Sequence, residues 1–393
     1  MRETPVLSSR TLSERAGATV SLKAENLQRT GSFKLRGALS KLAALGDACA
    51  AGVVTGSAGN HAQAVAFAAR ARGVPCYVFM PEPAPIAKVE AARALGANVS
   101  MVGLTVDEAL EAAYERAADD ERMAFVHPFE DPDVIAGQGT LGLELLEQVP
   151  DLARVIVPVG GGGLISGVAI ALKSERPAIE VFGVQAASCA PVRGSLAAGK
   201  PVAVRSALTI ADGIAVKRPG ETTLALIEQW VDGMVEVAED ELAEAMVFLL
   251  ERAKLVVEGA GAVGAAALLA GRLPPSPSGT TVVILSGGNV DAGLLAEVAR
   301  RHESQAGRRM VLLARLPDRP GSLARLLTLV GELRANLLDV EHIREGFDLH
   351  VRETAVQMVL ETRGQMHADR VTEAVRAAGY EEPRPLRQAR LER

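Results

Sequence analysis

Short apolar runs rich in β-branched residues alternate with longer Ala- and Leu-rich stretches along most of the chain. Uniformly apolar runs are typical of strands buried on both faces, and the stretches between them have helical periodicity. The predicted strands are Ala18–Lys23, Val74–Met80, Ala97–Val102, Arg154–Val159, Glu180–Gln185 and Thr280–Leu285, and the predicted helices include Asn60–Arg72, Ile86–Leu95, Val106–Ala118 and Asp240–Lys254. This alternation predicts an α/β fold with mainly parallel sheets covered by helices on both faces.

The pattern changes towards the C-terminus. A polar, basic stretch, Arg300–Arg309, is a candidate linker between two domains. Beyond it we predict a strand, an amphipathic helix and a second strand at Met310–Leu316, Leu323–Leu333 and Leu337–His342. The sequence therefore predicts a large region, residues 1–305, followed by a small α+β domain, residues 306–393.

Composition and charge exclude several classes of protein. The 393 residues are 48% hydrophobic and 23% charged, which suits a globular protein with a full core. A net charge of −6 without a basic stripe argues against nucleic-acid binding. No apolar run has the length of a membrane span, and the N-terminus lacks a signal-peptide core. Cys49, Cys76 and Cys189 have no pairing or metal-ligand spacing. We therefore expect a soluble, cytoplasmic protein that binds neither nucleic acid nor membranes.

Four segments carry residues suited to chemistry, and the first contains Lys34. In GSFKLRG, residues 31–37, this lysine lies in a turn-like sequence just before a helical stretch. A positioned amine can form a Schiff base with an aldehyde cofactor. A lone lysine is more commonly a solvated surface residue, so this segment alone decides nothing.

The second segment is SAGNH, which lies between a strand ending near Thr55 and a predicted helix. Its residues are Ser57, Ala58, Gly59, Asn60 and His61. Small residues let a ligand approach the backbone, and free N–H groups at a helix start favour a carboxylate or a phosphate. The alternatives are an ordinary N-cap for Asn60 and a plain first-turn position for His61.

The third segment is a run of four glycines. A buried strand leads directly into Gly160, Gly161, Gly162, Gly163 and Leu164, and a helix follows. Bare N–H groups backed by a helix dipole suit a phosphate. No Gly-Lys-Ser/Thr follows, and the spacing of a dinucleotide-binding loop is absent. The alternative is a tight, flexible turn.

The fourth segment, Ser286–Asn289 (SGGN), also follows an apolar strand. Ligands of open α/β sheets collect at the carboxyl ends of the strands. A lone serine at such a position is usually a cap or turn residue.

Together and in this order, the four segments resemble the fold-type-II pyridoxal-phosphate family. That family includes threonine dehydratases, serine dehydratases, serine racemases and the tryptophan synthase β-subunit. The resemblance covers roughly residues 5–300, and the threonine dehydratases match best. It is carried by SFKLRGA, SAGNHAQAVA, VPVGGGGL and LSGGNVD, with PEPAPIAKVE, DPDVIAGQGT, TIADGIAVKRPG and VVEGAGA. The resemblance implies two open, twisted, mainly parallel sheet domains, with a small subdomain of roughly 35–130 inserted between 1–34 and 131–305.

The resemblance also implies a role for each segment. Lys34 would bind pyridoxal 5'-phosphate as a Schiff base and remove the α-proton, and Phe33 would pack against the cofactor ring. Gly160, Gly161, Gly162, Gly163 and Leu164 would bind the phosphate, Asn60 the 3-oxygen, and Ser286 would face the ring nitrogen. Residues 57–61 would bind the substrate carboxylate, and Glu258 is a further candidate near the ring. The implied reaction is β-elimination and deamination of L-threonine to 2-oxobutanoate and ammonia, with L-serine as a secondary substrate.

Two departures from the family pattern bear on function. The family's racemases have a serine at the position of Ala58 and an acidic metal ligand at the position of Gln185, so we expect neither racemisation nor a metal requirement. The chain starts close to the first strand of the family fold, so we expect the usual N-terminal helical segment to be missing. The alternatives are a serine dehydratase or racemase, a non-catalytic amino-acid sensor, and a nucleotide-dependent transferase. The intact Lys34 argues against the sensor, and the lack of a Walker lysine argues against the transferase.

The tail from Met310 resembles an ACT domain, an α+β ferredoxin-like fold. The signature is Asp318-Arg319-Pro320-Gly321-Ser322-Leu323, followed by Asn336 and Val340. The resemblance implies an amino-acid site at Asp318, Pro320, Gly321, Ser322 and Asn336 that a second chain completes. We therefore expect a homodimer or homotetramer, with isoleucine or valine as an effector. An alternative is a tail that only aids assembly.

Overall fold

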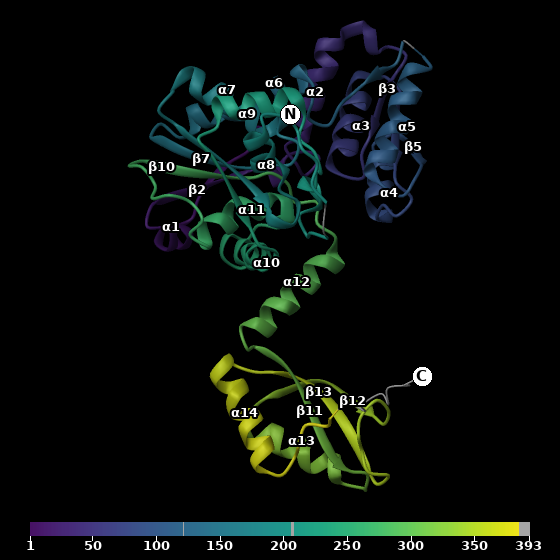
Figure 1. Ribbon diagram of the computed structural model, residues 1–393, viewed down its shortest axis with the longest axis vertical. Helices are drawn as coiled ribbons and strands as arrows, with labels where there is room; N and C mark the ends of the chain where they lie inside the picture. The colour runs from purple at the N-terminus through teal and green to yellow at the C-terminus, as the bar shows by residue number, and fades with distance from the viewer. Residues whose placement is uncertain (121, 206–207, 385–393) are drawn as a thin grey trace. The chain divides into compact units, whose positions relative to one another are not determined.

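The computed structural model describes residues 1–120, 122–205 and 208–384. It divides into two compact units, Met1–Ala292 and Gly293–Arg393. In Figure 1 the first unit runs from purple to green, and the second from green to yellow. We describe each unit by itself.

The larger sheet of the first unit has six strands in the order β1-β2-β10-β7-β8-β9. The strands are β1 (Val6–Ser8), β2 (Thr19–Ala24), β7 (Leu152–Pro158), β8 (Glu180–Ala186), β9 (Gly233–Val237) and β10 (Thr280–Leu285). Only the β1–β2 pair is antiparallel. The accompanying helices are α1 (Arg10–Ala16), α6 (Pro132–Gln148), α7 (Gly163–Glu175), α8 (Pro191–Ala198), α9 (Glu221–Trp230), α10 (Glu239–Phe248) and α11 (Gly259–Leu269). Every residue of β10 is buried, as its uniformly apolar sequence predicts.

The smaller sheet has four parallel strands in the order β5-β4-β3-β6. Its strands are β3 (Val53–Gly56), β4 (Cys76–Met80), β5 (Asn98–Met101) and β6 (Ala124–Phe125). The helices of this part are α2 (Lys34–Leu45), α3 (Asn60–Arg72), α4 (Ile86–Ala94) and α5 (Val106–Ala118). The predicted fold class, two mainly parallel sheets with helices, is confirmed.

The predicted elements match the observed ones with one notable exception. The stretch Asp240–Lys254, predicted to be one α-helix, is α-helical only to Phe248 and continues as a π-helical turn, Leu249–Ala253. It ends at Lys254, which has a left-handed φ of 60°. Apolar periodicity cannot reveal this change, because both helix types present similar faces over a single turn.

The second unit contains an antiparallel sheet in the order β11-β13-β12. Its elements are α12 (Ala292–Gln305, which starts at the unit boundary), β11 (Arg309–Pro317), α13 (Ser322–Glu332), β12 (Asn336–Ile343), β13 (Glu353–Glu361) and α14 (Gln365–Ala377). Leu326 and Val330 of α13 and Val371 and Val375 of α14 share one core with the sheet. This α+β arrangement was predicted for the tail. The stretch 300–309, predicted to be a linker, is helical as far as Gln305.

Among the described residues, no helix combines the length and the apolarity that crossing a membrane requires.

Candidate active site

Three neighbouring parallel strands of the larger sheet carry three of the predicted segments. These strands are β2, β10 and β7, in that order in the sheet. The chain leads from the end of β2 towards Lys34, from the end of β10 to Ser286, and from the end of β7 to the glycine run. The Phe33 N–H donates to the Ser286 carbonyl at 3.0 Å, which fixes the start of α2 beside the end of β10. The sheet therefore brings these segments, far apart in sequence, to one edge (Figure 1).

Lys34 is the first residue of α2, and it is partly buried. Its Nζ donates to the Pro128 carbonyl at 2.7 Å. Burial lowers the pKa of the amine to about 8, against the opposing effect of the Glu258 carboxylate. The alternative of a solvated surface lysine is therefore wrong, and the amine has the reduced basicity that nucleophilic chemistry near neutral pH requires.

The glycine run presents backbone donors without protein partners. Gly161, Gly162 and Gly163 are buried, and among the described residues no hydrogen bond is donated by the N–H of Gly160, Gly161 or Gly162. Gly162 has a φ of +94°, which a residue with a Cβ adopts only with strain. Buried N–H groups are nearly always paired in proteins, so unpaired ones at the start of α7 fit an anionic group such as a phosphate.

Asn60 joins the two sheets and does not cap its helix. The N-cap of α3 is Gly59, so the alternative of an ordinary N-cap for Asn60 is wrong. The Asn60 side-chain amide donates to Glu258 Oε1 at 2.7 Å and accepts from the Asn289 amide at 2.8 Å. Asn60 therefore lies at the edge where the carboxyl end of β3 faces the segments that follow β10.

The rest of the SAGNH segment forms a short turn. Ser57 Oγ accepts from the Gly59 N–H at 3.3 Å, and Ala58 is partly buried. His61 is buried, with Nε2 3.0 Å from the Val126 carbonyl. Burial lowers the pKa of His61 to about 3, so the ring is neutral. Its Nε2 therefore carries the hydrogen and donates to Val126.

Glu258 is the main charged neighbour of Lys34. Its motif, VVEGAGA, gives only a weak indication that this residue belongs to the site. The residue is 5% exposed, and burial together with Asp212 raises the pKa of its carboxyl to about 7. A Cβ on Gly287 would overlap the Glu258 carboxylate, so glycine is required where that loop passes. Sequence reasoning missed Pro128 altogether, because a backbone carbonyl has no residue-specific signature.

Ser286 and Phe33 lie beside Lys34. Ser286 is 2% exposed, and its hydroxyl makes only a long contact, 3.5 Å, with the Ala260 carbonyl. The Phe33 ring centroid is 5.2 Å from Lys34 Nζ. A buried hydroxyl with so weak a partner can turn to a ring nitrogen, which fits the donor set that pyridoxal phosphate requires.

Gln185 is buried and bonded to the backbone. Its amide donates to the Val159 carbonyl at 3.2 Å and accepts from the Val192 N–H at 3.1 Å. Within the described part of the chain, no group of three or more His, Cys, Asp or Glu side chains is arranged to hold a metal ion.

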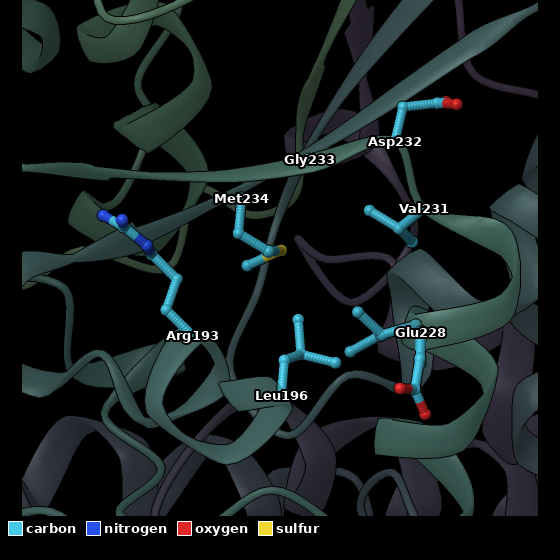
Figure 2. A pocket seen from close by; sticks show the side chains of 8 residues that line it. Arg193, Leu196, Glu228, Val231, Asp232, Gly233 and Met234 are labelled. Atoms are coloured by element: carbon cyan, nitrogen blue, oxygen red, sulfur yellow. The ribbon is translucent and has the colours of Figure 1, made fainter. Parts of the chain in front are cut away.

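A surface hollow lies elsewhere, on α8, α9 and β9. Figure 2 shows this hollow from close by. Its lining residues are Arg193, Leu196, Ile227, Glu228, Val231, Asp232, Gly233 and Met234. It contains none of the predicted site residues. Strand β9 is the sheet edge, two strands away from β7, so this hollow is separate from the cluster around Lys34.

In the second unit, the predicted effector residues fall in two places. Gly321, with a φ of +85°, caps α13, and Ser322 is buried behind it. Asp318 pairs with Arg344 at 2.5 Å, and Pro320 is exposed. Asn336, at the start of β12, bonds to Glu361, the last residue of β13, whereas Pro317 pairs with Glu353, the first. One copy of the unit therefore keeps Asn336 and the Asp318–Ser322 loop at opposite ends of its sheet.

Comparison with known proteins identifies the family. The model of the family "Pyridoxal-phosphate dependent enzyme" matches residues 1–287. An L-threonine ammonia-lyase of Geobacter sulfurreducens is 48% identical over 97% of this chain and 94% of its own, and one of Thermotoga maritima is 46% identical over the same shares. A solved structure of maize serine racemase is 36% identical, with a TM-score of 0.72, over 77% of this chain and 93% of that one. The chain therefore belongs to the pyridoxal-phosphate-dependent enzymes, in the branch that contains the L-threonine ammonia-lyases.

Proposed function

We propose that this chain is a pyridoxal-phosphate-dependent L-threonine ammonia-lyase, which converts L-threonine to 2-oxobutanoate and ammonia, with L-serine as a secondary substrate. The observation that carries the proposal is the position of Lys34. Its weakly basic amine lies at the sheet edge shared by the unpaired glycine N–H groups and the Ser286 hydroxyl. The full-length similarity to L-threonine ammonia-lyases supports threonine as the substrate.

The proposed mechanism assigns the proton transfer to Lys34. Pyridoxal phosphate, when bound, supplies an electron sink for bond breaking at the substrate Cα. Lys34 holds the cofactor through its amine, and it then takes the proton from the substrate Cα as a general base. A pKa near 8 leaves a substantial neutral fraction of the amine at physiological pH, which both roles require.

The turn before α3 is assigned to the substrate carboxylate. Ser57, Asn60 and His61 lie at the N-terminus of this helix, where N–H groups and the helix dipole favour an anion. His61 is neutral and therefore contributes no charge to this contact. The hydrogen bonds from Asn289 and to Glu258 fix the Asn60 amide, which we assign to the 3-oxygen of the cofactor.

Ser286 is assigned to the ring nitrogen, with Phe33 packed against the ring and residues 160–164 around the phosphate. A serine offers a hydroxyl without charge, so it does not hold the ring nitrogen protonated as a carboxylate would. The electron sink is then weaker, which favours rapid loss of the β-hydroxyl over reprotonation at Cα.

A ketoacid assay over hydroxyamino acids tests the activity. We expect ammonia and 2-oxobutanoate in equal amounts from L-threonine, slower pyruvate formation from L-serine, and no product from their D-isomers. A protein that turned over none of these amino acids after loading with pyridoxal phosphate would contradict the proposal.

Racemisation is the alternative that the maize structure raises. It requires a proton donor on the face opposite Lys34, and Ala58 has no polar atom to provide one. We therefore expect D-serine to remain below a few per cent of the pyruvate formed during long incubation with L-serine, with or without divalent metal. Chiral analysis of the remaining serine checks this, and comparable amounts of D-serine and pyruvate would establish a racemase.

We further propose that residues 306–393 form an ACT-like regulatory domain behind a catalytic region, residues 1–305, with a small subdomain of roughly 35–130. The separation of Asn336 from the Asp318–Ser322 loop supports an effector site formed by two copies of the chain, and hence a homodimer or homotetramer. The small hydrophobic amino acids isoleucine and valine are the proposed effectors, as end products of a pathway that starts from threonine deamination. The same assignment makes isoleucine biosynthesis the proposed role, and an assembly-only tail is the competing possibility.

A further inference from the structure

Thr223, in the first turn of α9, contacts the glycine run and forms a hydrogen bond with its backbone. Thr223 is fully buried, and its Oγ1 donates to the Gly161 carbonyl at 2.7 Å. A Cβ on Gly162 would lie 2.9 Å from the Thr223 Cβ, so the helix packs directly against the loop. On another side, a Cβ on Gly161 would overlap the ring of Phe129. The loop is therefore held between the buried Thr223 and the partly buried Phe129.

The bond to Gly161 sets the direction of a donor. In a trans peptide, the carbonyl of one residue and the N–H of the next point in opposite directions across the peptide plane. Because the Gly161 carbonyl points to Thr223 in α9, the Gly162 N–H points away from α9. That N–H has no partner among the described residues, so it is available to a ligand on the side away from the helix.

Glu130 fixes the first turn of α9, which carries Thr223, by accepting from its backbone N–H groups. Glu130 accepts from the Thr222 N–H at 2.5 Å and lies 3.2 Å from Thr223 Oγ1, at the N-terminus of α9. A carboxylate there is favoured by the free N–H groups and the helix dipole. The hydroxyl carries one hydrogen and can donate to only one acceptor at a time, and the Gly161 carbonyl is the nearest.

We propose that Thr223, braced by Glu130, is a positioning residue that orients the glycine loop for the phosphate of the cofactor. The inference rests on the proposed assignment of residues 160–164 to that phosphate. Without the hydroxyl, the buried Gly161 carbonyl loses its partner, and the peptide can rotate towards another donor. The Gly162 N–H would then no longer point at the phosphate.

The inference can be tested by comparing the binding of two aldehydes that differ only in the phosphate group. Spectroscopic titration of the apo-protein gives the Kd for pyridoxal 5'-phosphate and for pyridoxal. For Thr223→Val, we expect a Kd for pyridoxal 5'-phosphate raised by about 10-fold or more, roughly one charge-assisted hydrogen bond. The Kd for pyridoxal should stay within about 2-fold, because pyridoxal lacks the group that the loop binds. Thr223→Ser, which keeps the hydroxyl, should restore phosphate-dependent binding.

Thr222→Val is the matched control. The residue is adjacent and exposed, and its hydroxyl makes no hydrogen bond within the described part of the chain, so both Kd values should match those of the wild type. Equal weakening of both aldehydes in Thr223→Val, or of neither, would overturn the inference, as would a Ser variant as weak as Val. A wild-type protein that bound both aldehydes equally well would instead contradict the assignment of the loop to the phosphate.

Discussion

One set of paired charges from each unit shows how burial changes the role of an arginine. In the first unit, Arg36 follows Lys34 by two positions and is fully buried, with Glu25 and Glu144 each at 2.7 Å. In the second unit, the pair between Arg344 and Asp318 is 61% and 39% exposed. Burial keeps the first set in one arrangement, because a buried charge cannot leave its partner without a large penalty, whereas water and salt screen the second. The buried set thus holds the start of α2, where Lys34 lies, in one position, whereas the exposed pair adds little constraint to the loop at Asp318.

The largest expected effect comes from removing the amine around which the first unit is organised. Lys34→Ala should lower kcat/KM for L-threonine by at least about 10³-fold, because it removes both the covalent attachment and the general base. Steady-state ketoacid formation measures this, and circular dichroism shows whether the fold is kept. Lys41→Ala is a control on the same helix, since Lys41 pairs with Asp131 and Asp133 instead of facing the site. Substantial turnover by the Lys34 variant would show that the base is another residue.

The contrast between the two arginines can be tested directly by their effect on stability. Arg36→Leu leaves the buried Glu25 carboxylate without its cation and removes one of the two cations paired with Glu144. It should lower the free energy of unfolding of the first unit by about 3–5 kcal/mol. Arg344→Leu, the surface counterpart, should leave the midpoint of urea unfolding unchanged within error. Urea titrations of both variants, followed by far-UV circular dichroism because both units contain helices, provide the comparison. Equal losses of stability would mean that burial does not distinguish the two pairs.

These contacts show how far the sequence alone could lead. The apolar runs predict the central strands correctly, and β10, for example, is buried along its whole length. The motifs at the carboxyl ends of these strands predict which segments meet. The partners of those segments are harder to predict. Asn60 is bonded to Glu258 and Asn289, about 200 positions away, and Lys34 is bonded to a backbone carbonyl. Thr223 has an ordinary helical sequence around it, so its role follows only from the position of α9.

The next prediction concerns whether the effector site of the second unit is formed by two copies of the chain. If isoleucine or valine binds between the Asp318–Ser322 loop of one copy and Asn336 of another, it should change the KM for L-threonine by about 5- to 150-fold, the usual range of allosteric coupling. Gly321→Val should abolish this response, because the left-handed φ of 85° excludes a β-branched residue and the altered loop would no longer admit the ligand. Activity without effector should stay unchanged.

Calorimetry and sedimentation complete this test. Gly331→Ala, on an open position of α13, is the control for a glycine substitution in the same unit, and it should respond to isoleucine as the wild type does. If neither amino acid gives binding heat, and kinetics are equal in the full chain and in a chain ending at Gln305, the second unit serves only in assembly. A monomeric protein would exclude the shared site as well.

The smallest expected effect is a shift in pH dependence caused by one buried charge. With the pKa of Lys34 at about 8, about a tenth of the amine is neutral at pH 7, against roughly 1 in 3,000 at the ordinary value. The rate at which the apo-protein takes up pyridoxal phosphate should therefore rise with pH and level off above about 8. The pKa of Glu258 is about 7, so its carboxylate is negative where Lys34 titrates and stabilises the protonated amine. Glu258→Gln removes that charge and should move the midpoint to lower pH, while Glu14→Gln on the exposed face of α1 should not move it. A midpoint near 10.5 would show that burial does not lower the pKa of this amine. An unchanged or higher midpoint in the Glu258 variant would show that the carboxylate does not stabilise the protonated amine.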